Sequence, residues 1–177
     1  MERIELRDIA GYLPYGLNVI SLKPHSKTIG ELYVEYGGMN SVQVRSNDFE
    51  DESGYILPLR EINPILRPLS SLYKPILHNG KEEVPILELA RIASPSKEWV
   101  LNKKEEYVEA EDINFDKWYF SFEEPSAFVL RAGYDPKIIY NQHKLFDYLH
   151  SRFIDYCGLI DAGLAISVYD LENNPYE

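Results

Sequence analysis

The chain has 177 residues, a formal net charge of −11 and a single cysteine, Cys157. A chain of this length can bury a sizeable core without disulfides, and one cysteine excludes an intrachain disulfide and argues against a cysteine-based zinc site. The acidic balance disfavours partners that present phosphate backbones or anionic lipid. The sequence shows no signal peptide and no apolar run of about 18 residues, so we expect a cytoplasmic protein that makes no membrane contact.

The N-terminal part of the chain predicts one short helix followed by several strands. Apolar side chains with helical spacing at residues 6–13 predict the helix, which Pro14 ends. The extended runs that follow alternate apolar and polar side chains and are separated by turn residues, so they predict a small antiparallel sheet, either simply curled or an SH3-like half-barrel. These runs are a strand at residues 17–22, a hairpin at 30–46 that turns at Gly37-Gly38, and an edge strand at 54–59 that contains Pro58.

Five of the 11 prolines lie between Pro58 and Pro85, and two of them fall in INPILRPLSSL, residues 62–72. Each proline removes a backbone donor and pushes the preceding residue towards extended geometry. We therefore predict neither a continuous helix nor a central strand here. The aliphatic side chains recur every three or four residues, so we interpret the segment as a rigid apolar strap packed across the sheet. The alternative, a proline-rich ligand for a partner domain, is disfavoured by so many large aliphatic side chains.

The middle of the chain predicts a hairpin, a helix and a second hairpin. His78-Asn79-Gly80 is a turn signal between two short extended runs, and Pro85 suits the first turn of a helix. Residues 97–126 carry nine acidic side chains against four lysines, a local charge of −5. Within this acidic block, KWYFSF, EEPS and AFVLRAG predict a strand, a turn and a second strand.

NQHKLFDYLHSRFIDYCG, residues 141–158, has the clearest helical pattern in the chain. Gly158 stands where a left-handed C-terminal cap belongs, and we interpret Cys157 as a small buried side chain at the helix end. Residues 163–171 then predict a last strand. The apolar stripe of the predicted helix consists of Leu145, Leu149, Phe153 and Tyr156.

Taken together, these elements predict an α+β fold. It comprises an N-terminal antiparallel sheet, the proline-rich strap, the central hairpin and helix, and a C-terminal amphipathic helix followed by a strand. We treat residues 1–177 as a single domain. The alternative is a division into a β-rich half, residues 1–95, and an α+β half, residues 96–177.

One segment approaches a calcium-loop pattern, which needs oxygen ligands at positions 1, 3, 5 and 12 and a glycine at position 6. Lys117 replaces the glycine, and the residues after it alternate like a strand, which would carry the twelfth position away from the others. A polar turn entering a hairpin is therefore the favoured interpretation. The four candidate ligands in DINFDKWYFSFE are Asp112, Asn114, Asp116 and Glu123.

A second candidate metal group lies on the predicted C-terminal helix. His143, Asp147 and His150 follow at i, i+4 and i+7, so two imidazoles and a carboxylate share one helix face. That face is opposite the apolar stripe, and no fourth ligand is evident. A solvated helix face is therefore the favoured interpretation, and we assign no metal.

The usual signatures of catalysis and cofactor binding are missing from the sequence. It contains no G-x-S-x-G elbow, no G-x-x-x-x-G-K-[ST] loop and no G-x-G-x-x-G fingerprint. Adjacent carboxylates such as Glu105 and Glu106 lie in an acidic run, whereas acid/base catalysis needs one carboxylate in a drier environment than its partner. We therefore assign no catalytic residue and no cofactor, and the sequence gives no reason to expect an enzyme.

Five segments carry a resemblance to a known group of proteins. The chain resembles an uncharacterised family found in phages, prophages and conjugative elements of Bacteroidetes, for which no activity is established. The resemblance implies a mobile-element context and no mechanism. The segments are YLPYGLNV, EINPILRPLSSL, HNGKEEVPILELARIA, KLFDYLHSRFIDYCGLIDAGLAI and ENNPY.

Three functions remain open at this point. The favoured one is a non-enzymatic protein–protein interaction module whose partner is a host or phage protein or a second copy of the chain, because the sequence is rich in tyrosine and lacks catalytic signatures. The second is a nucleic-acid regulator, which the net charge opposes. The third is an enzyme or small-ligand pocket built from scattered side chains, which a concave pocket with a buried titratable group would support.

Overall fold

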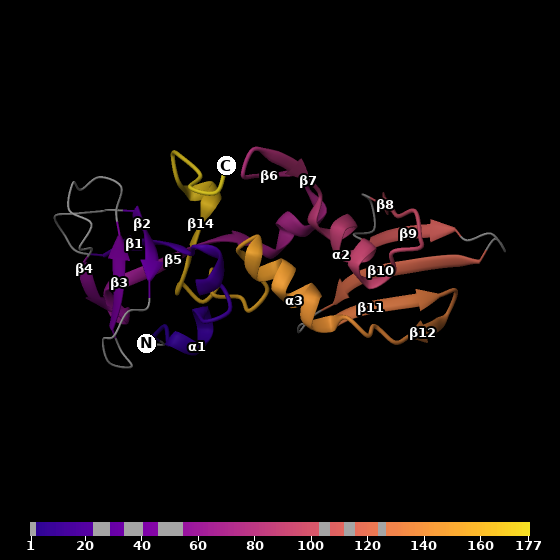
Figure 1. The fold of residues 1–177 in the computed structure, drawn as a ribbon, viewed down its shortest axis with the longest axis horizontal. Coiled ribbons are helices and arrows are strands. Elements are labelled where there is room, and N and C mark those ends of the chain that lie inside the picture. Colours follow the sequence, from indigo (N-terminus) through magenta and orange to yellow (C-terminus); the bar gives the residue numbers. More distant parts are fainter. Residues whose placement is uncertain are drawn as a thin grey trace. The chain divides into compact units, whose positions relative to one another are not determined.

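The computed structural model describes residues 3–22, 29–33, 41–45, 55–102, 107–111, 116–123 and 127–177. Sheets and helices occur together in separate segments, so the predicted α+β class is confirmed (Figure 1). The chain forms two compact units. Unit 1 contains Met1–Pro68 and His150–Pro175, and unit 2 contains Leu69–Leu149 and Tyr176–Glu177. Compactness does not decide whether the units fold independently, so the single-domain interpretation, with residue 95 as its alternative boundary, stays a prediction.

Unit 1 is built around the predicted N-terminal antiparallel sheet. The first four strands pair in chain order, and β4 lies at the edge, as Pro58 indicated. The turn at Gly37-Gly38 lies outside the described residues. The helix predicted at residues 6–13 is split into α1 (Leu6–Ile9) and the 3-10 helix η1 (Leu13–Tyr15). The four strands are β1 (Asn18–Ser21), β2 (Ile29–Tyr33), β3 (Ser41–Arg45) and β4 (Tyr55–Pro58).

The proline-rich segment is a strand inside the sheet, so the prediction that it could not be a central strand is wrong. After the 3-10 helix η2 (Leu59–Glu61), β5 (Ile62–Pro68) pairs with β1 and with two C-terminal strands. Pro64 is the last residue of the β1 ladder, and Pro68 is the last residue of a second ladder. Each proline stands where a ladder ends, and there a missing N–H interrupts little pairing. The burial expected of a strap is present, since five of the seven residues of β5 are buried.

The C-terminal part of the chain completes this sheet. Two strands of two residues each, β13 (Ile154–Asp155) and β14 (Ile166–Ser167), pair with β5 in parallel. The strand predicted at residues 163–171 is thus much shorter than expected, and the 3-10 helix η4 (Val168–Asp170) follows it. Parallel pairing joins segments far apart in the sequence, so local pattern alone could not predict it.

The C-terminal helix ends earlier than its hydrophobic stripe predicted. Helix α3 (Gln142–Ser151) stops seven residues before Gly158, and Phe153 adopts a left-handed backbone with φ of 55°. Two backbone carbonyl groups at this turn accept hydrogen bonds from Arg67. The Arg67 N–H donates to Phe153 O at 2.7 Å, and Arg67 Nη1 donates to Arg152 O at 2.8 Å. Phe153 stays buried, as the stripe required, but from outside the helix.

Unit 2 begins with the 3-10 helix η3 (Leu69–Tyr73) and contains the predicted central hairpin and helix. The hairpin turns through Asn79 and Gly80, whose φ angles are 50° and 74°, as expected for a two-residue turn that needs positive φ at both positions. Pro85 is the first residue of the following helix, as predicted. The elements are β6 (Ile76–His78), β7 (Lys81–Glu83) and α2 (Pro85–Ala93).

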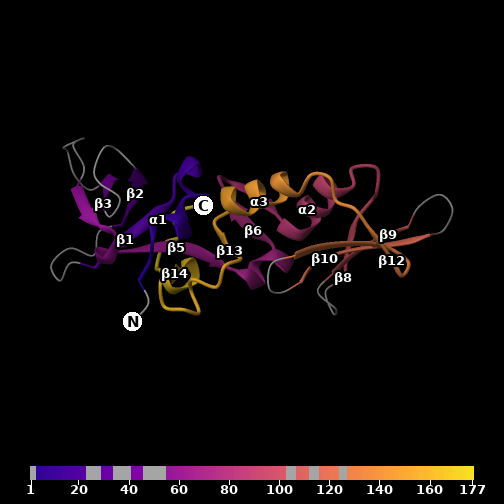
Figure 2. The same cartoon turned by 90° about the horizontal axis from the view of Figure 1, so that it is seen from below.

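A five-stranded antiparallel sheet in the order β12-β11-β10-β9-β8 completes unit 2. The strands predicted in KWYFSF and AFVLRAG are present as β10 and β11, and the turn between them lies outside the described residues. Helices α2 and α3 lie on the same side of this sheet (Figure 2). The strands are β8 (Val100–Asn102), β9 (Tyr107–Glu111), β10 (Lys117–Glu123), β11 (Ala127–Ala132) and β12 (Asp135–Lys137).

The side chains that face the helices form the core of unit 2. Phe120 is stacked on Phe128 with ring centroids 5.9 Å apart, and Phe128 in turn meets Phe146 of α3 edge to face at 5.3 Å. The Tyr148 hydroxyl donates to the buried carboxylate of Glu83 at 2.7 Å and so ties α3 to β7. One face of the sheet is therefore covered and rigidly packed.

We expect Arg67→Ala to lower the free energy of unfolding by about 3 kcal/mol, because it removes donors to a helix-end carbonyl and leaves a cavity at a fully buried site. Urea titration followed by circular dichroism measures this change. Arg91→Ala, which removes an exposed arginine that pairs with Glu88 on α2, should change it by about 0.5 kcal/mol or less. Equal effects of the two substitutions would contradict the assigned role of Arg67.

Candidate functional site

The strands β9, β10 and β11 present a second face that no helix covers within the described residues. Because successive side chains of a strand point to opposite faces, the residues that alternate with the buried Phe120 and Val108 all lie on this side. The ladder places Tyr119 between Glu109 of β9 and Arg131 of β11. We call this surface the open face; its polar side chains on these strands are Tyr107, Glu109, Glu111, Lys117, Tyr119, Ser121, Glu123 and Arg131.

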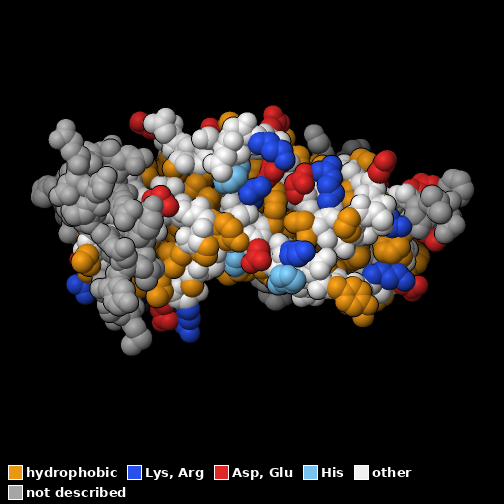
Figure 3. All heavy atoms as spheres, in the orientation of Figure 1, with side chains coloured by type: hydrophobic (Ala, Val, Ile, Leu, Met, Phe, Trp, Pro, Cys, Tyr) orange, Lys and Arg blue, Asp and Glu red, His pale blue; other side chains and the backbone are white. Residues whose placement is uncertain are grey.

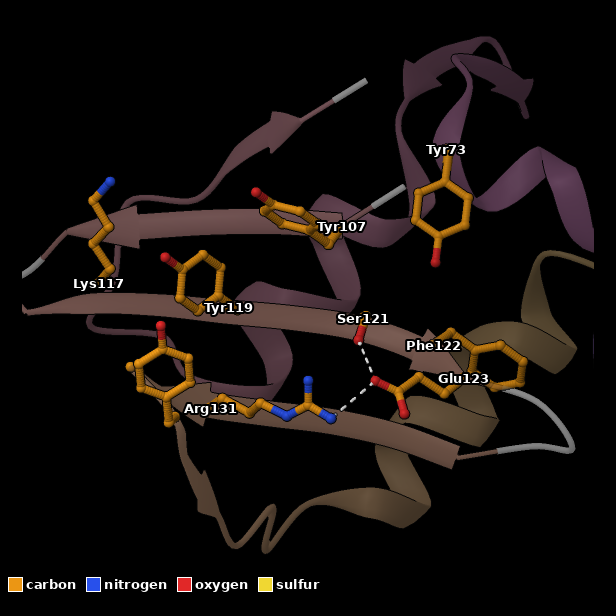
Figure 4. A pocket seen from close by; sticks show the side chains of 10 residues that line it. Tyr73, Tyr107, Lys117, Tyr119, Ser121, Phe122, Glu123 and Arg131 are labelled. Atoms are coloured by element: carbon orange, nitrogen blue, oxygen red, sulfur yellow. Dashed lines mark hydrogen bonds and ion pairs between the residues drawn. The ribbon is translucent and has the colours of Figure 1, made fainter. Parts of the chain in front are cut away.

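A groove of about 1040 Å³ runs over the open face. Figure 4 shows Lys117, Tyr119, Ser121 and Glu123 along β10, with Tyr107 and Arg131 on the neighbouring strands. Such a volume is at the upper limit for a small-ligand pocket. The groove is lined by Tyr73, Tyr107, Lys117, Tyr119, Ser121, Phe122, Glu123, Arg131, Gly133 and Tyr134.

Two tyrosines form the centre of the groove. The rings of Tyr107 and Tyr119 meet edge to face, with centroids 5.5 Å apart and an interplanar angle of 78°. Asn102 of β8 donates from Nδ2 to the Tyr107 hydroxyl at 3.1 Å. Both contacts restrict the rings, so the tyrosines offer apolar area and polar hydroxyls in a preset arrangement.

A charged pair borders the groove on the β11 side. Arg131 Nη2 lies 3.3 Å from Glu123 Oε1, and the Ser121 hydroxyl donates to the same carboxylate oxygen at 3.3 Å (Figure 4). About half of each charged side chain is exposed, 48% for Arg131 and 46% for Glu123. An exposed pair of this kind adds little stability, so both groups remain available to a bound partner.

Exposed hydrophobic side chains continue beyond the groove. Tyr134, which lines the groove, is fully exposed, and Ile138 and Tyr140 after β12 are 73% and 85% exposed. Figure 3 views the molecule from the side of α2 and α3, opposite the groove, and hydrophobic side chains reach the surface over β11 and β12 on that side as well. Large apolar side chains gathered in this way are typical of surfaces that contact another molecule.

The groove offers binding chemistry rather than catalytic chemistry. Its described lining contains no histidine and no cysteine, so no nucleophile is paired with an imidazole base there. Its titratable groups lie on an open surface, where water solvates them. Stacking, hydrogen bonding and charge pairing are what this arrangement can supply.

The calcium-loop pattern is only partly covered by the structure. Asp112 and Asn114 lie outside the described residues. Lys117–Glu123 is a continuous strand, as the alternation predicted, and an extended strand of this length carries Glu123 roughly 20 Å from Asp116. Glu123 pairs with Arg131 instead. The structure therefore does not bring these two carboxylates together.

The three candidate ligands of α3 are not gathered around a common point. His143 and Asp147 are exposed, whereas His150 is partly buried. The His150 ring packs against Tyr12 with centroids 4.9 Å apart, and its Nε2 lies 2.8 Å from the Tyr156 hydroxyl. Among the described residues, no group of three or more His, Cys, Asp or Glu side chains could hold a metal ion.

Cys157 is exposed, so its interpretation as a buried residue at a helix end is wrong. The cause is the early end of α3, which places residues after Phe153 in a surface turn. Partial burial still raises the pKa of the Cys157 thiol, as do the neighbouring carboxylates of Asp155 and Asp8, while a hydrogen bond with Tyr156 lowers it. A raised pKa keeps the thiol protonated and therefore a poor nucleophile.

No protein-family model matches the chain, and neither a curated protein nor a solved structure matches it. Within the described residues, no helix is long and apolar enough to cross a membrane. The geometry of the open face is therefore the basis on which a function can be assigned. The open face was not predicted from the sequence, although the alternation in KWYFSFE already separates Tyr119 and Ser121 from the buried aromatic residues.

We expect Tyr156 to make stability fall at alkaline pH. Burial, with smaller contributions from Cys157, raises the pKa of Tyr156 from 10.0 to about 12. Between these values the unfolded chain has lost the proton and the folded chain keeps it, so this contribution is complete below pH 10 and lost as pH approaches about 12. Urea titrations at several pH values should show a shallower decline for Tyr156→Phe than for Tyr169→Phe, an exposed control. Identical slopes would contradict the assignment.

We expect Gly11→Ala to destabilise unit 1 by about 1–3 kcal/mol, because a Cβ at Gly11 would overlap the His150 ring. That ring is held by Tyr12 and Tyr156, so it cannot move freely. The double variant Gly11→Ala/His150→Ala should be more stable than the sum of the single changes predicts, by about 0.5 kcal/mol or more in urea titration. Strict additivity would show that the two sites do not interact.

Proposed function

We propose that the chain is a non-enzymatic protein–protein interaction module that receives a segment of another protein on the open face of unit 2. One observation carries this proposal: a tyrosine-lined groove lies on one face of a sheet whose other face is tightly packed. A rigid scaffold limits the entropy lost on binding, and tyrosines are among the side chains that contribute most to protein interfaces.

The composition of the groove favours a polypeptide partner over the two alternative functions. A nucleic-acid strand would meet a chain of net charge −11, and the open face itself carries Glu109, Glu111 and Glu123. A small-molecule enzyme would need an enclosed site with a dry acid or base, which this wide surface does not offer. A polypeptide can follow the length of the groove and use its hydroxyls, rings and charges together.

Three finer points belong to the same proposal. The order β5-β1-β2-β3-β4, with a 3-10 turn before the returning strand, supports an SH3-like arrangement in unit 1. A fold of this type does not define a function, so the binding role is placed on unit 2. We further propose that the protein acts in the cytoplasm of a bacterium as the product of a phage or mobile element.

Affinity capture with matched tyrosine variants tests the proposal. The tagged chain and the variants Tyr119→Ala, Tyr107→Ala and Tyr169→Ala would be used to capture proteins from bacterial host lysate, with quantification by mass spectrometry. Tyr169 is 58% exposed in unit 1 and serves as the control. A partner of the open face should bind the wild type and the control equally, and the groove variants at least about tenfold more weakly.

Two results would contradict the proposed function. The first is a partner retained equally by the wild type and both groove variants, which would place binding elsewhere on the molecule. The second is the capture of no protein at all, combined with a monomeric wild type in analytical ultracentrifugation. A dimer that the groove variants abolish would instead identify the partner as a second copy of the chain.

A further inference from the structure

We propose that the segment received by the open face is cationic, and that a lysine or arginine of the partner lies against the tyrosine pair beside Glu109 and Glu111. This inference rests on the proposed function and specifies the chemistry of the partner. It follows from how charge is distributed over the open face and from what the aromatic rings can bind.

The charges of the open face do not cancel. Arg131 and Glu123 pair with each other, so they contribute little net charge. The remaining charged side chains are Glu109, Glu111 and Lys117. No ion pair joins either Glu109 or Glu111 to another described residue, and Glu111 is exposed opposite Lys117. The β9 side of the groove is therefore acidic, and its carboxylates are available to a cation.

The register places these carboxylates next to the tyrosines. Tyr107, Glu109 and Glu111 alternate on one side of β9, and the ladder sets Glu109 directly opposite Tyr119. Directly opposed side chains in an antiparallel pair have Cβ atoms about 5 Å apart. A cation on the β9 side of Tyr119 would thus reach a carboxylate and an aromatic ring together.

The tyrosine pair is suited to a cation. Because Tyr107 and Tyr119 meet edge to face, at most one ring face is covered by the contact between them. The face of an aromatic ring is electron-rich and attracts ammonium and guanidinium groups. The same sheet already holds such a contact, since Lys97 Nζ lies 4.1 Å from the centroid of the Trp118 ring.

The charged side chains of the groove also restrict where along it a cation of the partner can bind. Arg131 flanks Tyr119 on the β11 side and disfavours a second positive charge there. Lys117 faces Glu111 across the ladder and partly offsets its charge. A cation at Tyr119 therefore meets Glu109 first and Glu111 second. The acidic β9 side is the remaining position. A chain of net charge −11 adds a long-range attraction for a basic segment, which salt would screen.

Selection from a library of random 12-residue peptides displayed on phage tests this inference with the full chain as bait. The selected peptides should be enriched in lysine and arginine over the starting library. A synthetic copy of the strongest binder should then bind Glu109→Gln/Glu111→Gln roughly tenfold more weakly than the wild type in isothermal titration calorimetry. Its affinity should also fall as sodium chloride increases.

A matched control keeps the net charge change the same. Glu82→Gln/Glu172→Gln removes two exposed carboxylates outside the open face, one of them on β7, and should bind the peptide like the wild type. All four substitutions are at groups on the surface of the folded chain, and circular dichroism confirms that each variant is folded. Equal weakening by both double variants would show that only overall charge matters and would overturn the inference.

The remaining outcomes separate the inference from the proposed function. Selected peptides that are not cationic, but lose binding to Tyr119→Ala, would overturn the cationic partner and leave the open face as a protein-binding surface. Peptides that bind Tyr119→Ala as well as the wild type would contradict both. So would a selection that yields no binder.

Discussion

Strand β5 is hydrogen-bonded to three other strands within its seven residues, and the rest of unit 1 depends on this arrangement. Its first half completes the antiparallel sheet through β1, and its second half receives β14 and β13 in parallel. Arg67 strengthens the second half, because its backbone and its buried guanidinium both donate to carbonyls that follow α3. A buried cation is costly unless such acceptors are present, so the early end of α3 and the burial of Arg67 require each other.

Elements defined by neighbouring residues could be predicted from the sequence. The turn at Asn79-Gly80 and the helix start at Pro85 follow from local backbone preferences, and β10 and β11 follow from alternation. Elements defined by distant partners could not. Prolines weaken a strand only where a partner needs their N–H, and the sequence does not reveal where the β5 ladders end. The end of α3 likewise depends on Arg67, 85 residues from the carbonyl of Arg152 that it binds.

The open face illustrates a different limit of sequence reasoning. In KWYFSFE, aromatic side chains fall on both faces of the strand, because Tyr119 stands between Trp118 and Phe120. Periodicity shows that these side chains belong to two faces, but it does not show which face a helix will cover. That choice is made by the apolar sides of α2 and α3, which pack on Phe120 and its neighbours. The hydroxyl-bearing tyrosines therefore remain at the surface, where their polar atoms need no buried partner.

The order of the two units along the chain has a consequence for synthesis. Unit 2 is encoded almost entirely between the two segments of unit 1, so the ribosome releases β1 to β5 long before β13 and β14 exist. Until then, the second half of β5 lacks the two strands that pair with its backbone. Unit 2 can meanwhile form, because nearly all of its residues are contiguous in the sequence, and contacts between nearby residues form faster than long-range parallel pairing. The nascent protein thus exposes an incompletely paired strand, which can pair with other chains, for the time needed to translate unit 2. A chaperone that binds this strand would protect the chain most during that interval.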